Sequence, residues 1–131
     1  MKIHTIFLAC LLLAHAAIVE GASCRPIEYA EIQDTETVEL VKTYCYYGAV
    51  WKIHNDASTR QNRLFLEQIK TTQSTESLES LQSTYQRNDA LESARQRGCS
   101  DQQEKIVTAL KARGARVDLS CNPPPSARPK P

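Results

Sequence analysis

The sequence predicts an all-α protein, a small bundle of four to five helices that is stapled by disulfides. Apolar residues recur at the three- and four-residue spacing of one helix face, while the alternation typical of strands is almost absent. Capping residues stand at the ends of these periodic segments. Four cysteines follow residue 22, in a chain too short to bury a large core. Short connections between the expected helices favour antiparallel neighbours.

The first 22 residues have the pattern of a secretory signal peptide. Lys2 precedes an almost wholly apolar run over residues 6–19, and small residues follow it. Spanning a bilayer takes about 20 apolar residues, so this run of roughly 14 is too short to be a membrane helix. We therefore expect a secreted protein that begins between Ala22 and Cys24 and forms one helical domain over residues 23–121.

Two helices are expected in the first half of this domain. One covers residues 36–54, after a cap at Asp34 or Thr35, and it stops where two poor helix formers follow each other at positions 55 and 56. Another begins at Ser58, the first residue of a capping box, in which the side chain of Ser58 and that of Gln61 each satisfy a backbone donor.

Two further helices are expected in the second half. One covers residues 74–97 and ends at Gly98, where a left-handed C-terminal cap favours glycine. The other covers residues 100–113, begins with a second capping box and is closed by Gly114. A short extended return is expected after Gly114.

The last ten residues, 122–131, form a proline-rich tail. Proline removes backbone donors and blocks the helical turn, so no helix is expected there. We expect this tail to be disordered and solvated.

The four remaining cysteines are expected to form two disulfides in an oxidising compartment, with three possible pairings. The last helix is about 20 Å long, and eight extended residues return that far. A bond between the last two cysteines is therefore geometrically possible, together with one between the first two, and the two crossed pairings stay open. The cysteines are Cys24, Cys45, Cys99 and Cys121.

The chain offers little for catalysis. After the signal peptide it holds a single histidine, His54, for which a surface or capping role is expected. An acid–base pair, a Cys/His couple or a metal triad needs more histidines or free cysteines. We therefore predict no enzyme, no catalytic residue, no metal ligand and no cofactor.

Half of the eight aromatic residues fall within eight positions. Tyr44, Tyr47 and Trp51 share one helical face, whereas Tyr46 points elsewhere and is a candidate for an exposed partner contact. In a carrier of small ligands, the three residues of the shared face would line an apolar pocket together with Phe65.

Charge is distributed unevenly along the chain. Residues 23–84 hold six Lys/Arg and nine Asp/Glu, a net charge of −3, whereas residues 85–131 hold nine and five, a net charge of +4. These opposite charges nearly cancel, so neither nucleic-acid binding nor membrane insertion is predicted. A local basic patch can still steer an acidic protein partner. The candidate residues for this contact are Arg95, Arg97, Lys111, Arg113 and Arg116.

The cysteine pattern departs from that of the insect odorant-binding proteins, which have six cysteines, two of them four residues apart. Here Ala49 stands four residues after Cys45. The chain resembles more closely the small four-cysteine helical salivary proteins of blood-feeding insects, including the anophensin-like family of mosquitoes. The resemblance covers the signal peptide, the mature length, the four cysteines and the helix count, and it includes no functional motif.

This resemblance implies a secreted, non-enzymatic binding protein that inhibits a host plasma cascade. The cascade would be the alternative complement pathway or the contact and kallikrein–kinin system, and the partner a plasma protease or a complement component. Two other classes stay open, a carrier of small hydrophobic ligands and a venom-type toxin or receptor ligand. A carrier requires an internal cavity, whereas an inhibitor requires an exposed patch over a filled core.

Overall fold

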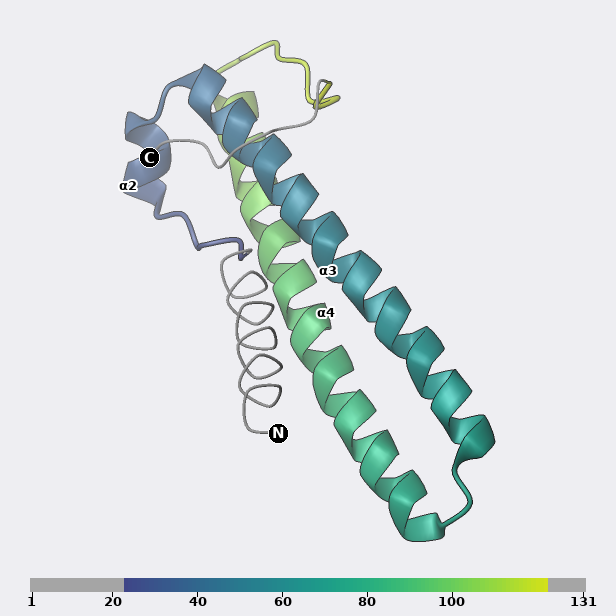
Figure 1. The fold of residues 1–131 in the computed structure, drawn as a ribbon. Coiled ribbons are helices and arrows are strands. Elements are labelled where there is room, and N and C mark those ends of the chain that lie inside the picture. Colours follow the sequence, from purple (N-terminus) through teal and green to yellow (C-terminus); the bar gives the residue numbers. More distant parts are fainter. Residues whose placement is uncertain (1–22, 123–131) are drawn as a thin grey trace, which may run out of the picture.

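The computed structural model describes residues 23–122 and contains three helices: α2 (Tyr29–Asp34), α3 (Thr37–Thr71) and α4 (Thr75–Ala112) (Figure 1). The predicted all-α class is confirmed, and this part of the chain has no strand. The predicted number of four to five helices is wrong, because two of the three helices are much longer than expected. The predicted signal peptide, residues 1–22, and residues 123–131 of the predicted tail lie outside the described residues.

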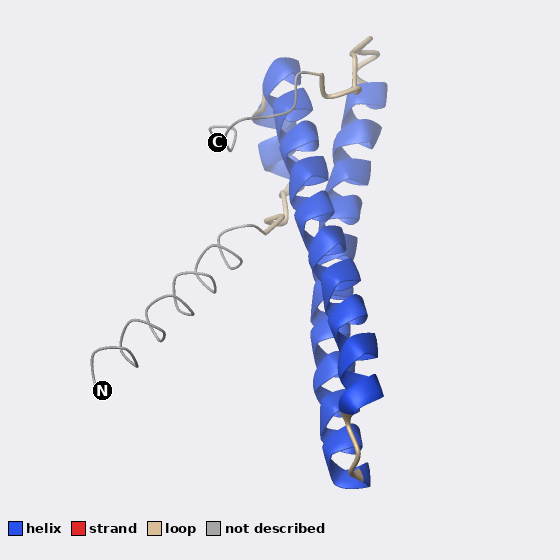
Figure 2. Cartoon of the chain, turned by 45° about the vertical axis from the view of Figure 1, so that its right-hand side comes forward, coloured by secondary structure: helices blue, strands red, loops and turns tan. Residues whose placement is uncertain are grey.

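The two long helices form a hairpin. α3 and α4 run antiparallel, side by side, and the loop of residues 72–74 joins them (Figures 1 and 2). α2 packs against α4 at the end where α3 begins and α4 ends. We call this end, residues 23–52 and 98–122, the head, and residues 58–91 the tip half. Between residues 23 and 122, none of the helices combines the length and apolar character that crossing a membrane requires.

The hydrophobic core lies in the head, where α2 adds a third element to the two long helices. The tip half has no third element, and none of its residues is fully buried. Two helices alone can cover only the stripe along which they touch, so a site of fixed geometry is expected in the head. The six buried residues of the core cluster are Ile27, Ile32, Leu40, Tyr47, Ile106 and Leu110.

Both disulfides are in the head, and they are crossed. Cys24 is bonded to Cys99, with Cα atoms 4.9 Å apart, and Cys45 to Cys121, with Cα atoms 5.4 Å apart. The uncrossed arrangement that the sequence allowed is not formed. It assumed that Cys99 precedes a separate helix, whereas Cys99 lies inside α4, facing the segment that leads into α2.

The predicted helix end at positions 55 and 56 is wrong, because α3 continues through it to Thr71. Asn and Asp cost only about 0.7 kcal/mol each in a helix interior, and tertiary contacts override such preferences. Side-chain contacts to α4 hold α3 before and after positions 55 and 56. His54 Nδ1 lies 2.7 Å from Oε2 of Glu92, and Ser58 donates to Oδ1 of Asp89 over 3.2 Å.

The predicted boundary at Gly98 and the second capping box is also wrong, because α4 continues through both. The glutamines of the predicted box bond across the fold. Gln102 Oε1 accepts from the backbone N–H of Ile27 over 2.9 Å, and Gln103 Nε2 donates to the carbonyl of Tyr44 over 3.0 Å. Cys99, between the glycine and these glutamines, has no exposed surface and is held by its disulfide.

The start predicted for the helix of residues 74–97 and the end predicted for the helix of residues 100–113 are confirmed, and they are the two ends of α4. At its start, Ser74 accepts from the backbone N–H of Ser77 over 3.1 Å, as an N-cap does. At its end, Gly114 has a φ of 65°, and its N–H donates to the carbonyl of Lys111 over 2.9 Å. Ala115 N–H donates to the carbonyl of Leu110 over 3.0 Å, which completes a Schellman motif.

Gly98 leads to a stability prediction. A glycine in a helix interior costs about 1 kcal/mol relative to alanine, and no atom lies within 4 Å of the position that a Cβ would take. We expect Gly98→Ala to raise Tm by roughly 4–8 °C in a calorimetric scan. Gly48 is the matched control, since its Cβ would lie 3.1 Å from Nε2 of Gln103 and disturb that bond. An equal rise in Tm for Gly48→Ala and Gly98→Ala would contradict the close approach of Gln103 to Gly48.

Candidate functional site

α2 is held to the rest of the head at its N-terminal side by the disulfide of Cys24 and by two hydrogen bonds. Tyr47 Oη donates to the carbonyl of Arg25 over 2.7 Å, and the bond from Ile27 N–H to Gln102 anchors the next turn of chain. Ile27 and Gln102 are both buried, at 6% exposure each. The segment that leads into α2 therefore has a fixed position on α4.

At its C-terminal side, α2 is held by Arg113. This guanidinium donates to the carbonyl oxygens of Ile32 over 2.5 Å, of Thr35 over 2.8 Å and of Gln33 over 3.3 Å. The last carbonyls of a helix have no partner within the helix and carry partial negative charge, which a guanidinium neutralises. Arg113 is thus a cap for α2 that is supplied by α4.

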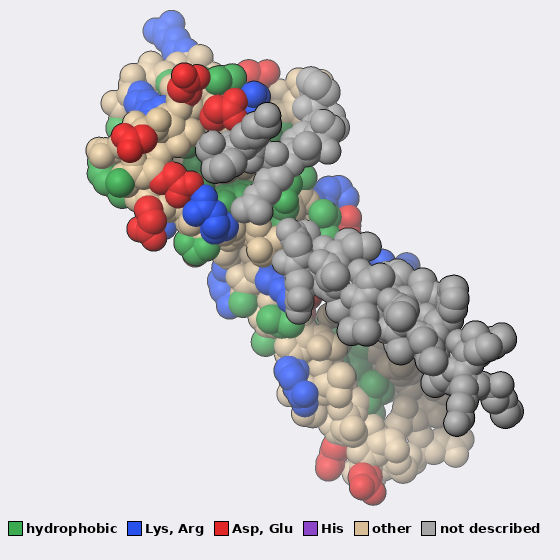
Figure 3. Space-filling model, turned by 60° about the vertical axis from the view of Figure 1, so that its left-hand side comes forward, with side chains coloured by type: hydrophobic (Ala, Val, Ile, Leu, Met, Phe, Trp, Pro, Cys, Tyr) green, Lys and Arg blue, Asp and Glu red, His purple; other side chains and the backbone are tan. Residues whose placement is uncertain are grey.

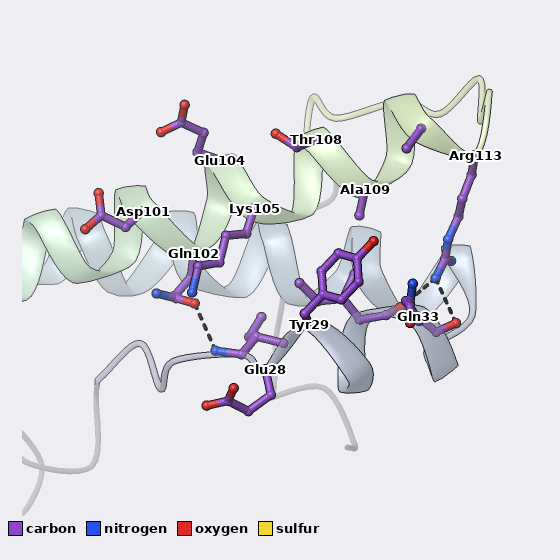
Figure 4. A pocket seen from close by; sticks show the side chains of 13 residues that line it. Glu28, Tyr29, Gln33, Asp101, Gln102, Glu104, Lys105, Thr108, Ala109 and Arg113 are labelled. Carbon is purple, nitrogen blue, oxygen red and sulfur yellow. Dashed lines mark hydrogen bonds between the residues drawn. The ribbon is translucent and has the colours of Figure 1, made fainter.

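Between these two attachments an open groove separates α2 from the last turns of α4 (Figure 4). We call it the α2–α4 groove; its volume is about 1090 Å³. Tyr29 lies between the two helices at its mouth, with 74% of its surface exposed. The apolar residues that line it are Ile27, Ile32, Ala109 and Ala112, and the polar ones Glu28, Tyr29, Gln33, Asp101, Gln102, Glu104, Lys105, Thr108 and Arg113.

Three carboxylates border the groove. Glu28 lies on the side of α2, while Asp101 and Glu104 lie along the outer edge of α4 (Figure 4). All three are exposed, and none forms an ion pair within residues 23–122. Lys105, whose side chain points toward α2, is a cation of the groove that is likewise outside any ion pair in this part of the chain.

Glu31, a carboxylate of α2 that does not line the groove, is already paired with a cation. Arg25 Nη2 lies 2.5 Å from Oε1 of Glu31. Hydrogen bonding to this guanidinium lowers the pKa of Glu31 below its ordinary value of 4.5, and the charge of Arg25 adds to the effect. Asp and Glu side chains nevertheless gather over the end of the molecule that holds α2 (Figure 3).

The five residues of the predicted basic patch are not brought together. Arg95 is half-buried and donates to Oε1 of Glu92 over 3.0 Å, while Arg113 caps α2. Arg97 and Lys111 are exposed on α4 but stand 14 residues apart, about 21 Å along a helix. Arg116 is exposed beyond the end of α4. Two of the five cations are thus engaged in contacts within the chain.

The predicted aromatic sites are also dispersed. Tyr47 is buried at 4% exposure, and Tyr44, Tyr46 and Trp51 are half-buried. The Tyr46 ring lies 6.0 Å from that of Tyr47 and packs against the core cluster. Phe65 stands 14 residues after Trp51, about 21 Å along α3, and none of the predicted pocket residues lines the α2–α4 groove. The structure does not gather them around one ligand.

The surface or capping role expected for His54 is wrong. His54 is 1% exposed, and it faces Glu92, which is 4% exposed, in the interface between α3 and α4. Glu92 also accepts from Arg95, so a buried polar network joins the two helices at mid-length. A histidine so deeply buried does not meet a substrate from solvent.

Sequence reasoning missed the α2–α4 groove. Residues 23–35 show no long periodic segment, and α2 itself has only six residues, with no side-chain hydrogen bond at its N-cap. Ile27 and Ile32 were the available signal, since they are the apolar residues of a segment otherwise rich in charge. Their partners on α4 lie more than 70 positions away in the chain, as in the bond from Ile27 to Gln102.

No three His, Cys, Asp or Glu side chains within residues 23–122 lie where they could hold a metal ion together. Comparisons of the chain with protein-family models, with curated proteins and with solved structures find no match. The resemblance to the salivary proteins of blood-feeding insects therefore stays a prediction.

Proposed function

We propose that this chain is a secreted, non-enzymatic binding protein that inhibits a plasma cascade by holding a protein component in the α2–α4 groove. The observation that carries the proposal is that α2 is held on α4 at both ends while the groove beside it is open. Contacts at both ends hold this six-residue helix against α4, yet the α2–α4 groove between them is open. Tyr29, at the mouth of the groove, is 74% exposed. An exposed aromatic side chain beside a preformed groove is typical of a protein contact site.

Two features support binding rather than catalysis. All four cysteines of the domain are in disulfides, so none is a nucleophile, and His54 is buried against Glu92. Two disulfides also suit an extracellular protein, since oxidising compartments favour them. The choice of a plasma target rests on the resemblance to the salivary proteins alone.

The test is a pair of plasma assays with the secreted, disulfide-bonded protein. We expect micromolar protein to inhibit either alternative-pathway haemolysis or contact-activated kallikrein, measured in parallel in the same plasma. Protein that has been reduced and alkylated is the control, and it is expected to be inactive because the segment that leads into α2 loses the bond of Cys24 to Cys99. If the native protein leaves both cascades unchanged, the proposed inhibition is wrong.

A further inference from the structure

The charge around the α2–α4 groove is unbalanced. Its lining includes three exposed carboxylates outside any ion pair of the described part, Glu28, Asp101 and Glu104, but only one such ammonium group, that of Lys105. The remaining cation of the lining, Arg113, keeps its charge but donates to the carbonyl oxygens at the end of α2. Three negative and two positive side chains leave the lining a net charge of −1. Figure 4 shows the carboxylate of Glu28 on the outer side of α2 and those of Asp101 and Glu104 on the outer side of α4. Complementary charge attracts a basic segment.

The other surfaces of the groove favour arginine over lysine. The exposed ring of Tyr29 offers a face on which a planar guanidinium can stack. A guanidinium also binds carboxylates in a bidentate way, which an ammonium group cannot do. The apolar floor at Ile32, Ala109 and Ala112 can pack against the aliphatic stem of the same side chain.

The length of the groove limits the size of the segment. Its lining on α4 runs from Asp101 to Arg113, about 18 Å by the helix rise. An extended chain covers that distance in about six residues. From these observations we propose that the α2–α4 groove binds an extended, arginine-bearing segment of the partner, an inference that rests on the proposed binding role of the groove.

The test uses a blocked hexapeptide of two arginines, two leucines and two glycines, titrated into the ¹⁵N-labelled, disulfide-bonded protein. Shift changes are expected at residues 27–33 and 101–113. The lysine peptide binds more weakly, and the citrulline peptide, which keeps the shape without the charge, does not bind measurably. Binding of the arginine peptide weakens as salt increases, because exposed charges are screened. Equal binding of the citrulline peptide, or shifts confined to the tip half, would overturn the proposal.

Two variants of the groove are expected to change the affinity for the arginine peptide in opposite directions. The triple change Glu28→Gln, Asp101→Asn and Glu104→Gln is expected to weaken the arginine peptide about tenfold. Lys105→Gln is expected to tighten it, since a like charge is removed. All four side chains are exposed, so the variants are expected to fold. The salt dependence measured on the wild-type protein tests the contribution of charge without any substitution.

The outcomes separate this inference from the proposed function. If the arginine peptide fails to bind while Tyr29→Ala abolishes plasma inhibition, the inference is wrong and the groove remains the contact site. If the arginine peptide binds as described while neither cascade is inhibited, the inference stands and the plasma target is wrong.

Discussion

Glu92→Leu is expected to lower the free energy of unfolding by about 3–5 kcal/mol, because it leaves the buried His54 without the carboxylate that it faces. The side chains of His54 and Glu92 are only 1% and 6% exposed, so water cannot replace the lost bond. Chemical denaturation followed by circular dichroism measures the effect, and Glu79→Leu, on the exposed surface of α4, is the control.

The double change His54→Leu and Glu92→Leu is expected to recover most of this loss. Replacing both members of a buried polar pair with apolar groups is often neutral. Arg95 loses its bond to Glu92, but its side chain is 26% exposed and can bond to water instead. If Glu92→Leu alone were as stable as the control, the buried pair would not join α3 to α4 as described.

Removing the Cys24–Cys99 disulfide by two serines is expected to cost about 4 kcal/mol, since the bond closes a loop with a sequence separation of 75. Removing Cys45–Cys121, with a separation of 76, is the matched control and is expected to cost about as much. Only the first change frees the segment that leads into α2. Hydrogen exchange should therefore become fast at residues 27–34 in that variant and not in the control.

Peptide mapping of the oxidised protein decides the pairing itself. A peptide that joins Cys24 to Cys99 is expected, and thiol titration under denaturing conditions should find no free cysteine. Finding Cys24 joined to Cys45 would contradict the claim that a disulfide holds the segment before α2 on α4.

The sequence predicts the helical class, because apolar spacing and capping residues report local preferences that the fold keeps at Ser74 and Gly114. It does not predict the helix count. Asn55 and Gly98 are local break signals that lie inside long helices, where contacts such as those of His54 and Cys99 outweigh costs of about 1 kcal/mol or less. Patterns of single residues do not reveal such contacts between distant segments.

The candidate site was harder to predict for the same reason. Arg113 appeared as one cation among several in a basic half, yet its partners are carbonyls about 80 positions earlier in the chain. Tyr29 lay in a short segment with no clear helical period. Charge counted along the sequence separated an acidic half from a basic half, whereas folding places acidic α2 against a helix, α4, that carries charges of both signs.

The central claim is that the α2–α4 groove is the contact surface, and comparing inhibitory potency between groove and tip variants tests it most directly. We predict that Tyr29→Ala lowers potency at least tenfold in the inhibited plasma cascade, since truncating a central contact costs about 2 kcal/mol or more. Arg113→Ala is predicted to lower potency as well, because α2 loses the cap that holds its C-terminal end on α4. Leu66→Ala and Arg63→Ala, which remove exposed side chains of the tip half, are predicted to keep nearly full potency. Loss of potency in the tip variants with none in the groove variants would contradict the claim.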